Sequence, residues 1–96
     1  MVSNMDKINI TTLSELKDTV DLMLSDDYNE RFVAEYVQTK IRYNKLHDII
    51  VKYQAKTLDF EPKSSLLLLQ NQASFMGQYL QQLEIRAQIE GIVLPK

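Results

Sequence analysis

The sequence contains no cysteine and no tryptophan, and it has only one histidine, two glycines and two prolines. Without cysteine, neither disulfide bonds nor thiolate metal sites can form. So few glycines and prolines leave little room for the turns of a β fold, whereas the many Leu, Gln, Glu, Lys and Ala residues favour helices. We therefore expect an all-α fold in a single domain, 1–96, because a chain of this length builds only one modest core.

Long apolar stretches are also missing. The run LLLL at 66–69 is far shorter than the roughly 20 residues that a membrane-spanning helix needs. The N-terminal residues MVSNMDKINI lack the charged-then-apolar order of a secretory signal. Together with the lack of cysteine, these absences predict a cytoplasmic protein without a membrane partner.

The charges are unevenly distributed along the chain. The formal net charge of −2 gives no general attraction to nucleic acid, so we expect no DNA or RNA partner. Residues 40–56, however, carry five cations against one acid, which gives +4 and leaves −6 for the rest of the chain. Cations near the C-terminal end of a helix interact favourably with its dipole. A local anion-binding site is the alternative explanation, and the sequence leaves both open.

Local signals predict a short helix at about 12–24. Thr12 and Glu15 form the T-x-x-E pattern of a capping box, in which each side chain accepts a hydrogen bond from the other residue's backbone. Apolar residues then recur at intervals of three and four as far as Leu24. We expect residues 1–25 to be an N-terminal extension that carries this one short helix.

Two much longer helices are predicted at about 26–54 and 64–90. Ser25 or Asp27 can cap the first of them, and Ser64 is the expected cap of the second. Neither segment contains a proline after its start, so nothing interrupts either helix.

Both long helices carry an apolar seam with alternating spacings of four and three, and the second ends at Gly91, a residue suited to a helix C-terminus. The seam residues are Phe32, Tyr36, Thr39, Tyr43, Leu46, Ile50 and Tyr53 in the first, and Leu66, Leu69, Ala73, Met76, Leu80, Leu83 and Ala87 in the second. Two such helices joined by a short loop predict an antiparallel helical hairpin, which forms a domain over 26–92.

The chain has more apolar residues than this seam can bury. The surplus comprises Val33, Val37, Ile49, Val51, Leu67, Leu68, Phe75, Tyr79, Ile85 and Ile89. The short first helix can cover some of them. Because large apolar patches rarely stay exposed, the remainder predict a homo-oligomer, either a dimer or a higher assembly such as a hexamer.

Motifs for catalysis and metal binding are absent. His47 is the only histidine, so no second one can complete a zinc site, and the acidic residues are scattered. There is no H-E-x-x-H, EF-hand loop, P-loop or G-x-S-x-G motif. We therefore expect a binding protein that is not an enzyme and that needs neither a metal nor another cofactor.

The stretch DDYNERFVAEYVQTKIRYNKL, residues 26–46, interleaves tyrosines with cations. Such a pattern can be a packed helix, or a platform that stacks a base and holds a phosphate. Tyr36 and Tyr43 fall on the apolar seam, so we assign them to the core. Tyr28 lies in the first turn, where a core is thin, and we consider it a candidate for ligand stacking.

The segments YNERFVAEYVQTKIRYNKLHDII and SLLLLQNQASFMGQYLQQLEIRAQIEGI, with F-x-P between them, resemble a helical-hairpin domain of small bacteriophage proteins. The resemblance covers roughly 26–92 and is to the phage anti-CBASS and anti-Thoeris proteins. It implies a phage anti-defence sponge that sequesters cyclic nucleotide immune signals without cleaving them, in the cytoplasm of the infected bacterial host. It also implies a symmetric oligomer with ligand pockets between protomers. The ligand would be a cyclic oligonucleotide or a molecule of the cyclic ADP-ribose type.

The resemblance also implies which residues bind the ligand. In that family a tyrosine near the start of the long helix stacks on a base, which corresponds here to Tyr28, followed by Asn29. A lysine about four turns later contacts phosphate, and its position falls on Arg42, with Lys45 as a close alternative. Arg31 is a weaker candidate. The sequence itself leaves open whether Arg86 serves a second pocket or only forms an ion pair with Glu84 or Glu90.

Helix geometry restricts how these residues can act together. Tyr28 and Arg42 are 14 residues apart, or about 21 Å along a straight helix, which is too far for one cyclic dinucleotide to touch both. Either the helix bends, or the two residues come from different protomers. A second function remains open, namely a small helical module that inhibits or bridges host or phage proteins.

Overall fold

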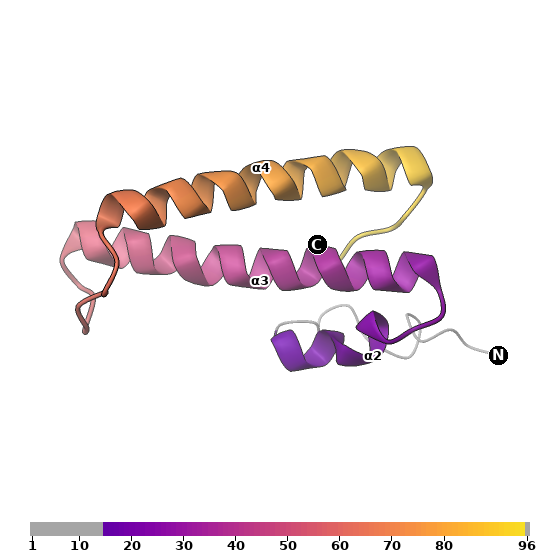
Figure 1. Ribbon diagram of the computed structural model, residues 1–96, viewed down its shortest axis with the longest axis horizontal. Coiled ribbons are helices and arrows are strands. Elements are labelled where there is room, and N and C mark those ends of the chain that lie inside the picture. Colours follow the sequence, from indigo (N-terminus) through magenta and orange to yellow (C-terminus); the bar gives the residue numbers. More distant parts are fainter. Residues whose placement is uncertain (1–14, 96) are drawn as a thin grey trace.

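The computed structural model describes residues 15–95, and these are all helical or connecting segments with no strand among them (Figure 1). The elements are a 3-10 helix η2 (Leu16–Thr19), α2 (Val20–Met23), α3 (Tyr28–Ala55) and α4 (Leu66–Glu90). None of the helices in this part of the chain is long and apolar enough to cross a membrane. The predicted all-α class and the long hairpin are confirmed.

The short N-terminal helix differs from its prediction. Thr12 lies outside the described residues, and Glu15 is the residue that precedes the helix, with an extended backbone. The predicted capping box of Thr12 and Glu15 would have placed Glu15 inside the first turn of the helix, and this prediction is wrong. Instead Glu15 pairs with Asp18, whose carboxylate accepts a hydrogen bond of 3.1 Å from the Glu15 N–H. The helical part therefore runs from 16 to 23 and starts as a 3-10 turn.

Helix α3 begins and ends through local backbone chemistry. Of the two predicted caps, Asp27 is the one used, because its carboxylate accepts a hydrogen bond of 2.9 Å from the Asn29 N–H. Ser25 supports this start by accepting from the Asp27 N–H. Lys56 ends the helix in the left-handed conformation, with φ of 62°, and its N–H bonds back to carbonyls of the last turn. The helix therefore extends to Ala55, one residue beyond the predicted end.

Helix α4 starts at Leu66, one residue later than a cap at Ser64 would give. Ser65, not Ser64, is the cap, since its extended backbone lets the hydroxyl accept a hydrogen bond of 3.2 Å from the Leu68 N–H. The predicted end is confirmed, because Gly91 takes the left-handed conformation with φ of 71°. The Ile92 N–H then bonds to the Ala87 carbonyl at 2.8 Å, which turns the last residues back toward α3.

The long helices lie antiparallel, and α2 packs on the other side of the first half of α3 (Figure 1). The core is concentrated in that half, where α3 is covered on two sides. It consists of Leu22, Phe32, Val33, Ala34, Tyr36, Val37, Ile41, Leu80, Leu83, Ala87 and Ile92. Thr19 fixes η2 there, because its hydroxyl donates to the Leu16 carbonyl and accepts from Gln38 of α3 at 2.9 Å.

The second half of the hairpin is covered on one side only, so its seam is less buried. Ile50 is buried there, Tyr43 is half-buried and Tyr53 is exposed. Val33 and Val37, which lie off the seam, are buried in the same cluster as Leu22 of α2. The short N-terminal helix therefore takes up part of the apolar surplus, as expected, and the remainder stays on the surface.

Candidate functional site

A three-residue polar network joins the start of α3 to the end of α4, at the end of the hairpin opposite the loop. Tyr28, the first residue of α3, donates a hydrogen bond of 2.7 Å from its phenol to Oε1 of Glu90. The same phenol oxygen accepts a hydrogen bond of 2.8 Å from Nη2 of Arg86. Nε of Arg86 and Oε2 of Glu90 are 3.1 Å apart, so the network is closed.

Aromatic contacts hold the network in place. The Arg86 guanidinium lies 5.0 Å from the centroid of the buried Phe32 ring, within the range of a cation–π interaction. The rings of Tyr28 and Phe32 are 6.2 Å apart with a tilt of 60°. Tyr28 is 46% exposed, so it offers aromatic surface to solvent directly beside a cation.

Each member of the network favours the protonation state that the others require. The hydrogen bond to the Glu90 carboxylate raises the pKa of Tyr28, which keeps the phenol neutral. The hydrogen bond from Tyr28, followed by that from Arg86, lowers the pKa of Glu90. The hydrogen bond to Glu90 raises the pKa of Arg86. Around neutral pH the network therefore holds one cation, one anion and a neutral phenol.

The predicted site residues near Tyr28 are at the helix start. Asn29 is exposed, and its N–H is already taken by the Asp27 cap. Arg31 is exposed as well, and its Nη1 donates a hydrogen bond of 2.8 Å to the Ser25 carbonyl. That contact ties Arg31 to the turn before α3, so its guanidinium supports the helix start.

The two predicted phosphate-binding residues lie elsewhere. Arg42 and Lys45 are exposed near the middle of α3, and neither has an ion pair within residues 15–95. Because α3 runs without interruption from Tyr28 to Ala55, Arg42 is about 21 Å along the helix from Tyr28. One chain therefore brings Arg86 to Tyr28, and does not bring Arg42 or Lys45 there. The ligand roles of the five predicted residues stay predictions.

Arg86 was foreseen only in part. The sequence predicts either a second pocket or an ion pair with Glu84 or Glu90, and the pair with Glu90 is confirmed. Its contact with Tyr28, 58 residues away in the chain, was missed. The signal that could have found it is the hairpin register, since the Asp27 cap and Gly91 mark the two helix ends that meet.

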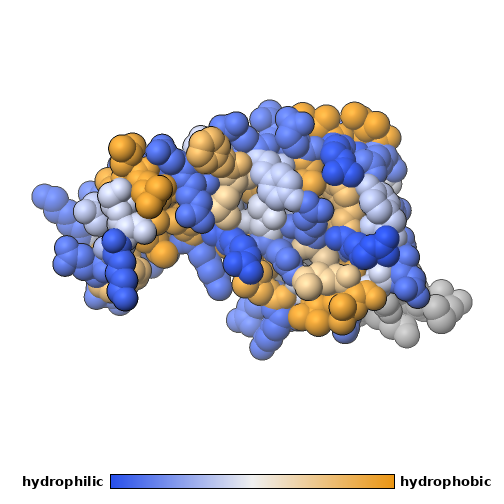
Figure 2. Space-filling model, in the orientation of Figure 1, coloured by the Kyte–Doolittle hydropathy of each residue, from blue (hydrophilic) through white to orange (hydrophobic). Residues whose placement is uncertain are grey.

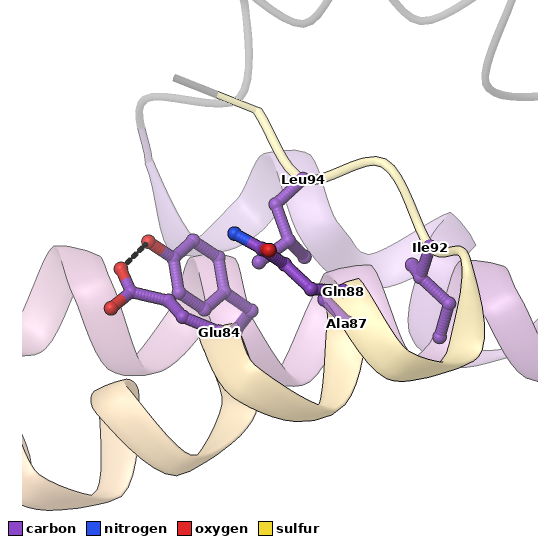
Figure 3. Close-up of a pocket in the computed structure, with 6 residues that line it drawn as sticks. Glu84, Ala87, Gln88, Ile92 and Leu94 are labelled. Atoms are coloured by element: carbon purple, nitrogen blue, oxygen red, sulfur yellow. Dashed lines mark hydrogen bonds between the residues drawn. The ribbon is translucent and has the colours of Figure 1, made fainter.

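A second feature is a hollow of about 380 Å³ next to the last turns of α4. Its lining residues are Tyr36, Glu84, Ala87, Gln88, Ile92 and Leu94. Figure 3 shows that Gln88 and Leu94 lie over it from α4 and from the C-terminal segment. The phenol of Tyr36 donates a hydrogen bond of 2.7 Å to Oε2 of Glu84. Tyr36 is 7% exposed, which confirms its assignment to the core, yet its hydroxyl reaches this hollow.

The Tyr36–Glu84 pair sets the chemistry of the hollow. Burial, followed by the hydrogen bond to Glu84, raises the pKa of Tyr36 to about 12. The phenol therefore stays protonated and the carboxylate stays its acceptor at physiological pH. Since the hollow has a carboxylate, an amide and no cation among its lining residues, it suits a neutral polar group better than a phosphate.

The structure gives His47 no catalytic setting. It is exposed and stacks on Tyr43, with ring centroids 6.1 Å apart and planes 15° apart. Within residues 15–95, no cluster of three or more His, Asp or Glu side chains is placed to hold a metal ion.

Comparison with known protein families matches residues 26–89 to the family described as Sequestin. Neither a curated protein nor a solved structure matches the chain. The matched segment includes α3, the connecting loop and all but the last residue of α4, and it therefore contains Tyr28, Tyr36, Glu84 and Arg86. It also agrees with the range over which the sequence resembles the phage sponge proteins. The chain belongs to the Sequestin family.

Proposed function

We propose that this protein is a phage anti-defence sponge that binds cyclic nucleotide immune signals in an infected bacterium and does not cleave them. The family name denotes sequestration, which is a binding function. The observation that carries the proposal is the pairing of an exposed tyrosine ring, Tyr28, with the guanidinium of Arg86 inside the segment that matches the family.

The two side chains supply complementary contacts for a nucleotide. An exposed tyrosine ring can stack on a base whatever the base is. An arginine can bind a phosphate through two parallel hydrogen bonds. In the free protein, Arg86 forms an ion pair with Glu90, and such a pair is weak because it is exposed to water. A ligand phosphate that binds the Nε–Nη2 edge of Arg86 therefore displaces this carboxylate and the hydrogen bond to the Tyr28 phenol.

The other predicted phosphate contacts, Arg42 and Lys45, act from a neighbouring copy in this proposal. Since α3 is continuous, Arg42 of one chain cannot reach a compact ligand stacked on its own Tyr28. A homo-oligomer that places the basic middle of one α3 near the Tyr28 of another copy would complete the site. The ligand class is a cyclic oligonucleotide or a cyclic ADP-ribose-type molecule.

Sequestration of this kind requires one binding site for each ligand molecule removed. In this proposal the hydrogen bond to Glu90 holds the phenol of Tyr28 neutral, and the ligand is bound without being cleaved. The protein therefore acts by mass action, so it must be tight-binding and abundant.

Titration calorimetry with a panel of cyclic dinucleotides, cyclic trinucleotides and cyclic ADP-ribose isomers tests the proposal. We expect tight binding of at least one ligand. After the complex is denatured, chromatography should show that the released ligand is chemically unchanged. Arg86→Ala and Tyr28→Ala should each weaken binding more than about tenfold. A folded protein that binds no member of the panel, or that returns a cleaved ligand, would reject the sponge.

One observation favours the second candidate, a protein-interaction module. Several large apolar side chains of α4, including Phe75 and Ile89, are exposed. If a host or phage protein covers these side chains, capture experiments should recover that protein at a fixed stoichiometry, and Phe75→Glu should abolish its capture. In that case the unaltered protein should bind no nucleotide of the panel.

A further inference from the structure

Glu90 is the last residue of α4, and it lies where the end of α4 meets the start of α3 (Figure 1). Figure 2 shows hydrophilic side chains on the surface at this end of the molecule. The segment that matches the Sequestin family ends at residue 89, so the family match assigns no role to Glu90. Its carboxylate is nevertheless the acceptor that closes the network with Tyr28 and Arg86.

The Glu90 carboxylate uses the donors that a ligand phosphate would need. Its Oε1 accepts a hydrogen bond of 2.7 Å from the Tyr28 phenol, and its Oε2 accepts one of 3.1 Å from Nε of Arg86. An arginine binds a phosphate best through two parallel N–H groups, and the Nε–Nη2 edge of Arg86 is the one that Glu90 and Tyr28 fill. Glu90 therefore occupies the anion position of the site with an anion of the chain itself.

The contact that Glu90 makes is easily broken. The side chains of Arg86 and Glu90 are 49% and 32% exposed, so water screens their attraction. Arg86 precedes Glu90 by four residues, which is the less favourable order for an ion pair along a helix. The partial negative charge at the end of α4 also opposes a carboxylate in the last turn. The carboxylate can therefore leave without loss of the helix, which Gly91 ends through its own backbone.

The two donors keep their places when the carboxylate leaves. The Arg86 guanidinium lies 5.0 Å from the centroid of the Phe32 ring, which is buried, and this contact does not involve Glu90. Tyr28 is fixed as the first residue of α3, after the Asp27 cap, and its ring packs beside the same Phe32. Only the acceptor of the network is therefore exchangeable.

A phosphate without a base gains little from this exchange. It takes the donors that Glu90 gives up, so one anion replaces another on the same groups. The displaced carboxylate stays attached to the chain and repels an anion that binds beside it. A nucleotide gains more, because its base also stacks on the exposed ring of Tyr28, which is a contact that Glu90 does not make.

We propose that Glu90 determines the specificity of the site: its carboxylate excludes simple phosphate anions from Arg86 and is displaced only by a ligand that presents a phosphate together with a base. This inference rests on the proposed function and adds which compounds the sponge ignores. Phosphates without a base, such as inorganic phosphate, are present in every cell and would otherwise compete for a free arginine. Their exclusion keeps the sites available for the nucleotide.

Glu90→Gln tests the proposal, because the amide keeps an acceptor for Tyr28 and removes the charge. In NMR titrations this variant should bind inorganic pyrophosphate more than about threefold tighter than the unaltered protein. Adenosine, which has a base and no phosphate, should bind both proteins equally. Glu35→Gln is the matched control, since Glu35 is an exposed carboxylate on α3 without an ion pair within residues 15–95, and it should change neither affinity. Circular dichroism verifies that the variants stay helical.

The effect of Glu90 must act through Arg86. In chains that carry Arg86→Ala, the change Glu90→Gln should no longer alter pyrophosphate binding. Three results would each overturn the role of Glu90: no gain for pyrophosphate with Glu90→Gln, an equal gain with Glu35→Gln, or an equal gain without Arg86. A gain for adenosine as large as that for pyrophosphate would also overturn it.

The nucleotide panel separates this inference from the proposed function. If a cyclic nucleotide binds tightly and Glu90→Gln gives no gain for pyrophosphate, the specificity role is rejected and the sponge stands. If Glu90→Gln gives the gain and no member of the panel binds, the exclusion of phosphate by Glu90 is supported and the sponge is rejected.

Discussion

The phenol oxygen of Tyr28 accepts a hydrogen bond of 2.8 Å from Nη2 of Arg86, which lies 58 residues later in the chain. This contact connects the first turn of α3 to the last turns of α4. It places a stacking surface and a phosphate-binding group next to each other in a single chain. It also assigns the neighbour of Tyr28 to α4, whereas the sequence had pointed to a second position on α3.

The ring and the hydroxyl of Tyr28 should contribute differently to ligand binding. Tyr28→Phe keeps the stacking surface and removes both hydrogen bonds, so we expect affinity within about fivefold of the original, whereas Tyr28→Ala should lose more than about tenfold. Calorimetry with the best ligand of the panel measures both. Since the network is exposed, neither change should lower the melting temperature appreciably. Equal losses for both variants would show that the hydroxyl, not the ring, carries the role.

A composite site can be detected by mixing two inactive variants. If Tyr28 of one copy and Arg42 of another form one site, Tyr28→Ala and Arg42→Ala chains should each bind poorly. Chains mixed after denaturation and refolding should then recover about a quarter of the sites of a dimer, because half of the dimers are mixed and each has one intact site. Calorimetric stoichiometry measures the recovery. A mixture as inactive as its components contradicts the role of Arg42 across the interface.

Tyr36 should make stability depend on pH in the alkaline range. An unfolded tyrosine ionises at its ordinary pKa of 10.0, whereas burial and the hydrogen bond to Glu84 raise the pKa of Tyr36 to about 12 in the folded protein. A raised pKa means that the stabilisation is complete below pH 10 and is lost as the pH rises toward about 12. Tyr36→Phe should cost about 1 kcal/mol at neutral pH and should show a smaller loss of melting temperature across this alkaline range.

The exposed Tyr53 provides the control for that experiment. Tyr53→Phe should leave the alkaline loss of melting temperature unchanged, since this residue is 41% exposed. The difference between the two variants removes the effect of all other groups that titrate at high pH. Identical alkaline profiles for the Tyr36 and Tyr53 variants would contradict the pKa of Tyr36.

The two glycines should respond to alanine with opposite signs. Gly77 lies inside α4, and a Cβ there would be 3.5 Å from Cε1 of Tyr43, which is an ordinary contact. Gly77→Ala should therefore stabilise the protein by up to about 1 kcal/mol, since alanine has the higher helix propensity. Gly91 has φ of 71°, so Gly91→Ala should destabilise it by about 1 kcal/mol through backbone strain. Urea unfolding measures both, and a destabilising Gly77→Ala would show that the helices cannot accommodate the methyl group.

The start and end of the two long helices could largely be read from the sequence, because these features are local. The carboxylate of Asp27 and the left-handed conformation of Gly91 depend on a few neighbouring residues, and both were expected. Ser64 and Ser65 are chemically equivalent caps, so the sequence could not choose between them. The structure chooses Ser65 through the path of the loop.

The candidate site could be predicted only in part, because it depends on the register between two helices. The sequence offered Tyr28 as a candidate and a pair with Glu90 as one of the alternatives for Arg86, and that ion pair is a contact within one helix. Many registers of a heptad hairpin bury similar apolar residues, so the pairs Tyr28–Arg86 and Tyr36–Glu84 had no local signature.

The sequence by itself determined that this chain is a helical hairpin with capped ends and more apolar residues than the hairpin can bury. Only the tertiary structure decided which of those residues α2 covers and which remain exposed on α4. It also decided that Arg86 reaches Tyr28. The physical reason is that helices and caps arise from interactions a few residues apart, whereas docking and register depend on packing between distant segments.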